Sequence, residues 1–235
     1  MKLLYEGKAK QLFEVENEQE IYVHYKNSAT AFNGVKKEEF EKKGVLNNTI
    51  SALIFEHLEK NGVRTHFIRK VNDTDQICQK VTIIPLEVIT RNLVAGSMAK
   101  KYGLEEGKKL SQPVFELSYK NDELGDPLIN DDHAIALDIV TQEELAEIKQ
   151  QTHRINTVLK DLFLQAGLVL VDFKIEFGKT HTGDIILADE ISPDTCRLWE
   201  VNTGEKLDKD RFRRDLGSVM EAYEEVLGRL EHAKS

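Results

Sequence analysis

The feature that most constrains the fold is the alternation of apolar and charged residues in the segment VDFKIEF, residues 171–177. Because successive side chains of a strand point to opposite faces, this pattern predicts a strand with one apolar face and one face that carries Asp172, Lys174 and Glu176. A polar turn and a second apolar run, 185–191, follow directly. The two runs predict a β-hairpin with the core on one face and the chemistry on the other.

Acidic residues on both arms of this hairpin predict a metal site. The second run ends in Asp189 and Glu190, whose side chains in a strand point to opposite faces, and Asp189 is the one we expect beside Glu176. Two carboxylates suit Mg2+, with nucleotide phosphates completing its coordination. The alternative is a solvated polar face, which antiparallel sheets commonly have. Lys174, lying between Asp172 and Glu176, favours a site for phosphate and metal.

The length and charge of the chain restrict its class. It has 235 residues, 40% of them hydrophobic, enough for one substantial domain or two small domains that share a cleft. The net charge of -9 disfavours a nucleic-acid binder, so an anionic substrate needs local basic clusters. Charges at Glu6 and Lys8 interrupt the first apolar run, and no later run approaches about 20 apolar residues, so we expect a cytoplasmic protein without a membrane segment. Cys78 and Cys196 are expected to be reduced packing residues.

The first part of the chain has the pattern of a mostly β structure. Strand-like residues in 3–15 and 21–25 predict a hairpin with residues 7–10 inside it. Either Asn47 or Asn48 is expected to cap a helix that Gly62 ends. Two further strands are predicted at 65–71 and 76–84.

Pro85 marks a change of character, because longer helical patterns follow it. We therefore predict an α+β protein in two parts. The first, residues 1–84, is a small and mostly antiparallel β domain. The second, residues 85–235, is a larger α+β domain that carries the metal and substrate sites.

The second part contains two strong helical patterns. Thr141 and Glu144 form a capping-box pattern at the start of a helix that Gly167 ends. A last helix is predicted from about Lys209 to Leu230.

Gly7, Lys8 and Lys10 are candidates for a phosphate site, because a glycine allows close approach of the backbone and the lysines supply positive charge. They match neither the P-loop nor the dinucleotide fingerprint, and an exposed basic strand is the alternative. A β-hairpin that covers phosphates is nevertheless the arrangement of kinase-type sites.

Arg91 interrupts an apolar run that ends in Gly96 and Ser97, so it is expected to have an anionic partner. Its guanidinium suits a substrate carboxylate or phosphate, with Ser97 at a helix start adding donors. A salt bridge to an acid across the fold is the equally weighted alternative.

A late basic cluster combines the segment SPDTCR, residues 192–197, with Arg211, Arg213 and Arg214. In an acidic chain this is a candidate anion pocket. Pairing with nearby aspartates explains part of the cluster, so we expect only one of those last three arginines to face a ligand. The acidic segment 121–132 is interpreted mainly as a solvated loop.

Together these segments resemble those of the SAICAR synthetase (phosphoribosylaminoimidazole-succinocarboxamide synthase) family over nearly the whole chain. The resemblance rests on YEGKAK at 5–10, PLEVITR at 85–91, AGS at 95–97, VDFKIEFG at 171–178 and DEISPD at 189–194. It implies a two-part fold related to the ATP-grasp and kinase-like folds, with ATP in the cleft between the parts. It also implies carboxyaminoimidazole ribonucleotide (CAIR) and L-aspartate as substrates, Mg2+ with the ATP, and a homodimer.

The resemblance assigns roles at matching positions. Lys8 and Lys10 would lie near the ATP phosphates, residues 84–86 would form the hinge beside the adenine through Ile84 and Leu86, and Glu176 and Asp189 would hold Mg2+. The residues implied to bind CAIR, the arginines and the serine taking its carboxylate and phosphate, are Arg91, Ser97, Asp172, Lys174, Arg197 and Arg213. Among these, Lys174, Asp172 and Arg197 are the expected catalytic residues.

One position departs from the family pattern. This chain has Asn33 where many family members have aspartate, and the amide removes a negative charge from near the metals. Asn33 is therefore not expected to be a direct metal ligand.

The expected reaction begins with transfer of the ATP γ-phosphoryl group to the CAIR carboxylate, since a free carboxylate is a poor acyl donor. The amine of aspartate then attacks the acyl phosphate. Positioning and electrostatic stabilisation would supply the catalysis, without a covalent enzyme nucleophile. The rival hypotheses are a kinase-like phosphotransferase and a nucleotide-binding protein without catalysis.

Overall fold

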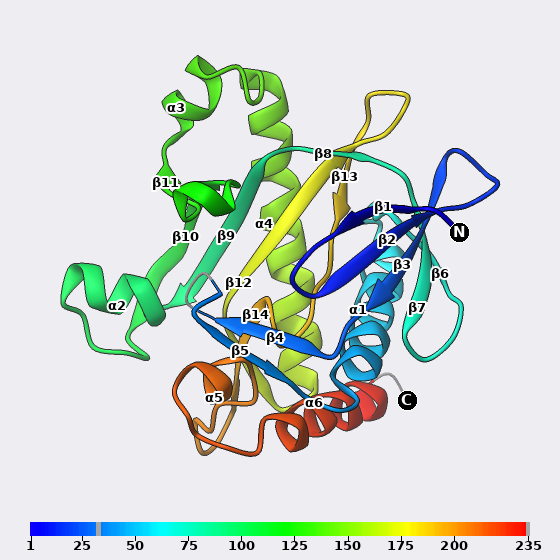
Figure 1. The fold of residues 1–235 in the computed structure, drawn as a ribbon. Coiled ribbons are helices and arrows are strands. Elements are labelled where there is room, and N and C mark those ends of the chain that lie inside the picture. Colours follow the sequence, from blue (N-terminus) through cyan, green and yellow to red (C-terminus); the bar gives the residue numbers. More distant parts are fainter. Residues whose placement is uncertain (32–33, 234–235) are drawn as a thin grey trace.

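The computed structural model of the chain describes residues 1–31 and 34–233, which form two main antiparallel sheets (Figure 1). The smaller sheet has the strand order β1-β2-β3-β7-β6. Its strands are β1 Leu3–Glu6, β2 Lys10–Glu14, β3 Glu20–Tyr25, β6 Phe67–Lys70 and β7 Asp75–Gln79. Residues 7–9 form the turn between β1 and β2, so the predicted first strand is two strands and the basic residues lie at a hairpin tip.

The larger sheet has the order β11-β10-β9-β12-β13, and β8 and β14 also pair with β12. Its strands are β8 Thr82–Ile83, β9 Leu86–Leu93, β10 Lys109–Tyr119, β11 Leu128–Ile129, β12 Leu168–Lys179, β13 Ile185–Ala188 and β14 Cys196–Glu200. The sheet confirms an α+β fold with antiparallel pairing. The long strand β12 is its centre, because β8, β9, β13 and β14 all pair with it.

The alternation on β12 is as predicted, but its charged face is also buried. Phe173, Ile175 and Phe177 belong to the hydrophobic core. On the opposite face, Asp172 and Glu176 are only 4% and 2% exposed. The alternative of a solvated polar face is therefore wrong.

The second arm of the hairpin is shorter than expected. β13 ends at Ala188, and Asp189 follows it with a left-handed backbone (φ 64°). Asp189 and Glu190 therefore lie in a turn beyond the strand, so strand alternation does not set the directions of their side chains.

Helix α1, Lys43–Lys60, begins earlier than predicted. Asn47 and Asn48 lie inside it and are buried, because their amides bind other segments: Asn48 donates to the carbonyl of Asn72 at 3.0 Å. A short hairpin of β4, Ser28–Ala31, and β5, Lys36–Glu39, precedes α1. Gly62 follows the helix with φ 75°, as expected for a helix stop.

The capping box of Thr141 and Glu144 is confirmed at the start of α4, Gln142–Gln165, which packs along β12 (Figure 1). The predicted last helix is instead two, α5 Asp210–Arg213 and α6 Val219–Ala233. The break has a backbone cause, since Gly217 has φ 71° and its neighbour Ser218 has φ 48°, values that no right-handed helix contains.

The shorter helical segments are α2 Gly96–Tyr102, η1 Asp122–Leu124 and α3 Asp131–Ala136. The acidic segment 121–132 is therefore partly ordered structure and not only a loop. Among the shorter helical segments, α2 and α3 lie on the side of the larger sheet where β10 and β11 are (Figure 1). Cys78 and Cys196 are free and buried, as predicted.

One hydrophobic core joins the two halves of the chain, because residues of α1, β12, α4 and α6 belong to the same buried cluster. β8 lies before Pro85 in sequence but pairs with β12, and Arg64 and His66 form main-chain hydrogen bonds with Leu187 of β13. The two sheets are thereby held against one another beside β12. Among the described residues, no helix is both long and apolar enough to cross a membrane.

Candidate active site

A pocket of about 140 Å³ lies on the charged face of the larger sheet. β9 and β12 pair with Arg91 opposite Asp172, so the alternation of both strands places these side chains on one face. All the residues expected to bind CAIR line this pocket, namely Arg91, Ser97, Asp172, Lys174, Arg197 and Arg213. Of the last three arginines of the late cluster, Arg213 lines the pocket, whereas Arg211 pairs with Glu205 and Arg214 with Glu106.

Arg91 is 4% exposed and has three polar partners. Its Nε donates to Glu116 at 2.7 Å, and its terminal nitrogens donate to Asp172 and to Ser97 Oγ at 3.1 Å each. The salt bridge across the fold, which was the alternative interpretation of Arg91, is therefore present, and it lies in the wall of the pocket. Arg91 is thus positioned by both neighbouring strands.

Arg197 lies across from Arg91 on the shared carboxylate of Asp172. Its Nη1 donates to Asp172 at 2.9 Å and its Nε to Asp210 at 3.0 Å, and Asp210 also accepts from Arg213 at 2.7 Å. Burial disfavours the charged guanidinium, but Asp172 and Asp210 outweigh it and raise the pKa of Arg197. The pocket wall is therefore a chain of alternating guanidinium and carboxylate groups.

Gly96, at the start of α2, makes room for this arrangement. Its φ is 53°, and a Cβ there would lie 2.4 Å from a terminal nitrogen of Arg197. A larger residue would displace the guanidinium, which explains why glycine precedes Ser97 at the pocket.

The acidic pair of Glu176 and Asp189 lies near this pocket and is held by lysines. Lys10 donates to Asp189, while Lys120 donates to Glu176 at 2.5 Å. Lys174 lies 3.5 Å from the same Glu176 oxygen. Each acid that was predicted to hold Mg2+ therefore already faces at least one ammonium group.

The charges of the two acids are coupled. Burial and the charge of Asp189 raise the pKa of Glu176, against the opposing effect of Lys174. Burial also acts to raise the pKa of Asp189, but Lys10 and Lys174 hold it below its usual range. Asp189 thus keeps its charge most readily, and a further cation nearby would favour the ionised form of Glu176.

The expected nucleotide residues lie on two sides of the acidic pair. Lys8 at the β1–β2 turn bonds to Asp122 at 2.6 Å, so this hairpin tip meets η1. The side chains of Ile84 and Leu86 are buried in the core, so at these two positions only the main chain can contact a ligand, while Pro85 between them is exposed. The N–H of Lys120 donates to the carbonyl of Pro85 at 3.0 Å. Lys120, whose ammonium bonds to Glu176, therefore lies beside the expected hinge.

Several polar residues of the site were missed from the sequence. Glu116 and Lys120 come from β10 and its end, and only the pairing of β10 with β9 brings them to the site. Asp194 belongs to the family segment at 189–194, but no role was assigned to it from the sequence. It accepts a hydrogen bond from the buried Lys43 at 2.6 Å. A signal for Lys43 existed, since a polar run opens the otherwise apolar α1. Asn33 lies outside the described residues.

In residues 1–31 and 34–233, no group of three or more His, Cys, Asp or Glu side chains is arranged to hold a metal. Any Mg2+ held by Glu176 and Asp189 would therefore need further ligands of another kind, such as the oxygens of phosphate or water.

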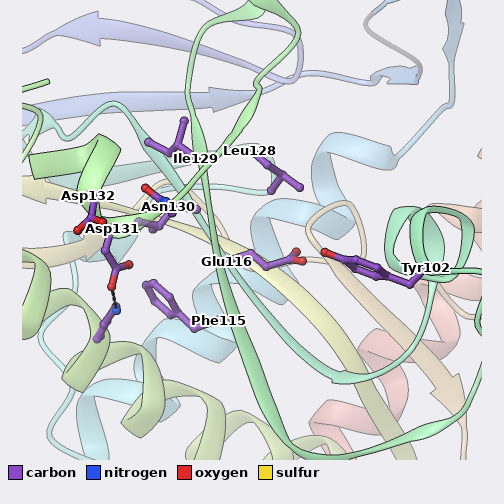
Figure 2. Close-up of a pocket in the computed structure, with 10 residues that line it drawn as sticks. Tyr102, Phe115, Glu116, Leu128, Ile129, Asn130, Asp131 and Asp132 are labelled. Carbon is purple, nitrogen blue, oxygen red and sulfur yellow. Dashed lines mark hydrogen bonds and ion pairs between the residues drawn. The ribbon is translucent and has the colours of Figure 1, made fainter. Parts of the chain in front are cut away.

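A larger pocket of about 590 Å³ lies at the β10–β11 edge of the sheet (Figure 2). Tyr102 lies toward one end and Asp131 toward the other, with Phe115 and Glu116 between them. Its lining cation, Lys149, is already bonded to Asp131. Glu116, Asp131 and Asp132 line the same pocket, so its charge is unfavourable for an anionic substrate.

Comparison with known proteins gives a consistent family. The SAICAR synthetase family model matches residues 3–230. The phosphoribosylaminoimidazole-succinocarboxamide synthase of Fusobacterium nucleatum is 60% identical over 99% of this chain and 98% of its own length.

Solved structures agree with this match. The crystal structure of the synthase of the same name from Ehrlichia chaffeensis has a TM-score of 0.97 at 45% identity, covering 98% of each chain. A SAICAR synthetase solved in complex with ADP has a TM-score of 0.94 at 46% identity, covering 97% of each chain. On sequence and fold alike, this chain belongs to the SAICAR synthetase family.

Proposed function

We propose that the chain is an ATP-dependent ligase that condenses CAIR with L-aspartate to give SAICAR, ADP and phosphate in purine biosynthesis. Membership of the family supports this activity, and a relative was solved with ADP. The observation that carries the assignment is the gathering of six matched residues around one pocket next to the Glu176–Asp189 pair.

CAIR would bind in this pocket. Arg91, Arg197, Arg213 and Ser97 supply donors for its carboxylate and phosphate, and each of the three arginines is held in place by a carboxylate of the fold. Such fixed guanidinium groups lose little freedom on binding an anion. Asp172 would orient Arg91 and Arg197 together.

ATP would bind beside the pocket, with the main chain of residues 84–86 at its adenine and Lys8 and Lys10 at its phosphates. The residues fit a Mg2+ ion, because the buried Glu176 and the half-buried Asp189 offer hard oxygen ligands that already attract ammonium groups. When bound, Mg2+ would offset negative charge on the phosphates. Lys10 and Lys120 would then be released toward the phosphates.

The reaction couples two displacements. An oxygen of the CAIR carboxylate attacks the γ-phosphorus, and the bond to the bridging oxygen of ADP breaks. The amine of aspartate next attacks the acyl carbon, loses a proton and expels phosphate together with that carboxylate oxygen. Lys174 lies between the pocket and Glu176, where it would stabilise charge on the transferring oxygens.

The roles of the two parts of the chain, its cellular compartment and its oligomeric state are proposed from the family resemblance. We propose that residues 1–84 and 85–235 act as the two parts that cover and carry the substrates, and that the enzyme is a cytoplasmic homodimer.

The test is ADP release measured with CAIR, ATP and aspartate, and again with each omitted. The ligase requires all three, and Glu176→Ala should abolish the release, whereas Glu143→Ala on the exposed start of α4 should not. ADP release that is unchanged without aspartate would instead indicate the kinase-like phosphotransferase.

A further inference from the structure

Lys209 is a half-buried cation whose ammonium has no bonded partner among the described residues. In the part of the chain that the structure describes, its ammonium makes no hydrogen bond and no ion pair. Other lysines near the pocket differ in this respect, since the buried Lys43 bonds to Asp194 and the half-buried Lys174 to Glu87, each at 2.6 Å. Partly buried charges are normally paired, so the exception points to a ligand that brings the opposite charge.

The main chain places Lys209 at the CAIR pocket. Its N–H donates to the carbonyl of Pro193 at 3.0 Å, next to Asp194. Its own carbonyl accepts from the N–H of Arg213 at 3.0 Å, one helical turn away. Asp194 and Arg213 both line the pocket, so Lys209 lies against its wall.

The surroundings of Lys209 do not fully compensate its charge. Burial lowers the pKa of Lys209, against the attraction of Asp194 and Glu190, and repulsion by Lys43 and Arg213 adds to the lowering. Asp194 makes no bond to Lys209; its carboxylate accepts instead from Lys43, from Asn47 and, at 2.6 Å, from the hydroxyl of Tyr223. An incoming anion would offset this repulsion.

The anion must come from a substrate whose other groups lie against the CAIR pocket. Aspartate carries two carboxylates, and its amine has to reach the activated carboxylate of CAIR. The pocket at the β10–β11 edge is unfavourable for an anion, since Glu116, Asp131 and Asp132 line it together with Lys149. The arginines of the CAIR pocket have their own assigned anions, which leaves the ammonium of Lys209 for aspartate.

We propose that Lys209 binds one carboxylate of L-aspartate beside the CAIR pocket. This inference rests on the proposed ligase function, and it adds the residue that selects the second substrate.

Kinetics with substrate analogues test the contact. Lys209→Met should lower kcat/KM for aspartate about 10- to 100-fold, as expected for loss of a charged hydrogen bond, with the CAIR dissociation constant unchanged. L-asparagine and L-isoasparagine each replace one carboxylate by an amide. For the carboxylate that Lys209 binds, the amide should reduce kcat/KM strongly in the wild type but only slightly in the variant, because both changes remove the same contact.

Further variants separate this role from a structural one. Lys209→Arg should retain part of the aspartate selectivity, and Lys160→Met, at an exposed lysine of α4, should behave as wild type. The thermal midpoint of Lys209→Met should not fall, since no partner is lost. Additive effects of Lys209→Met with both analogues, or a weakening of CAIR alone, would overturn the inference. A wild type that forms no ADP with all three substrates would instead overturn the proposed function itself.

Discussion

At the scale of the residue, Arg91 shows how the pocket obtains its shape. The planar guanidinium donates in three directions, to Glu116, Asp172 and Ser97, at distances of 2.7 to 3.1 Å. A lysine ammonium has positive charge but no fork, so it cannot maintain these contacts together.

Arg91→Lys should therefore weaken CAIR binding about 10- to 100-fold, measured by titration calorimetry without ATP. Arg69→Lys, an exposed arginine of β6, is the matched control and should bind CAIR as the wild type does. An unchanged dissociation constant in Arg91→Lys would refute the role of Arg91.

At the scale of the element, the β1–β2 turn meets η1 through Lys8 and Asp122. Both side chains are largely exposed, so their ion pair should contribute only about 0–1 kcal/mol to stability. Lys8→Ala should leave stability nearly unchanged but raise the KM for ATP several-fold. Asp122→Ala should not raise that KM, because it leaves Lys8 free for phosphate. Equal increases in both variants would show that the pair only orders the hairpin.

Helix α1 is tied to the turn after β13 by a buried charge pair. The side chains of Lys43 and Asp194 are 1% and 5% exposed. Lys43→Met should cost about 3–5 kcal/mol of unfolding free energy, because it leaves the carboxylate of Asp194 buried without its cation. Denaturant unfolding measures this loss. Lys42→Met, at the exposed neighbouring position, should cost less than about 1 kcal/mol, and an equally small loss in Lys43→Met would contradict the account.

At the scale of the whole molecule, His66 links the two sheets at the acidic pair. Its Nε2 lies 3.2 Å from the carbonyl of Asp189, and its ring packs edge-on against Phe55. Burial, with Lys10, lowers the pKa of His66 from 6.5 to about 4. The unfolded chain therefore takes up a proton near pH 6.5 that the folded protein does not bind until about pH 4.

The stability that neutral His66 contributes is thus present above pH 6.5 and lost as the pH falls toward 4. Relative to His66→Phe, the wild type should lose on the order of 3 kcal/mol of unfolding free energy between pH 7 and 4. His153→Gln, at an exposed histidine, is the control. Parallel stability curves for wild type and His66→Phe would contradict the assignment.

The sequence was most informative where local pattern sets structure. The alternation around Phe173 predicted the central strand and placed Asp172, Lys174 and Glu176 on one face, and the capping box at Thr141 predicted α4. The prediction of one continuous last helix was wrong, because an apolar pattern with helical spacing does not reveal the left-handed backbone conformation at Ser218. The prediction of Asn47 as a helix cap was wrong, because its tertiary contact with Asp194 outweighs the local preference of asparagine for the cap position.

The site could be predicted only in part for a related reason. Pocket residues on β9 and β12 were found because family segments carry them, and their convergence was not visible in either strand alone. Glu116 and Lys120 depend on the register of β10 against β9, a long-range pairing that no local signal sets. Lys209 was not assigned a role because a missing partner can be recognised only in three dimensions.

The most direct test of the proposed ligase follows a labelled oxygen. CAIR carrying oxygen-18 in its carboxylate is converted with ATP and aspartate, and the released phosphate is analysed by mass spectrometry. Activation as an acyl phosphate predicts that each phosphate carries one carboxylate oxygen and that SAICAR forms in equal amount. Unlabelled phosphate, or labelled phosphate without SAICAR, would contradict it.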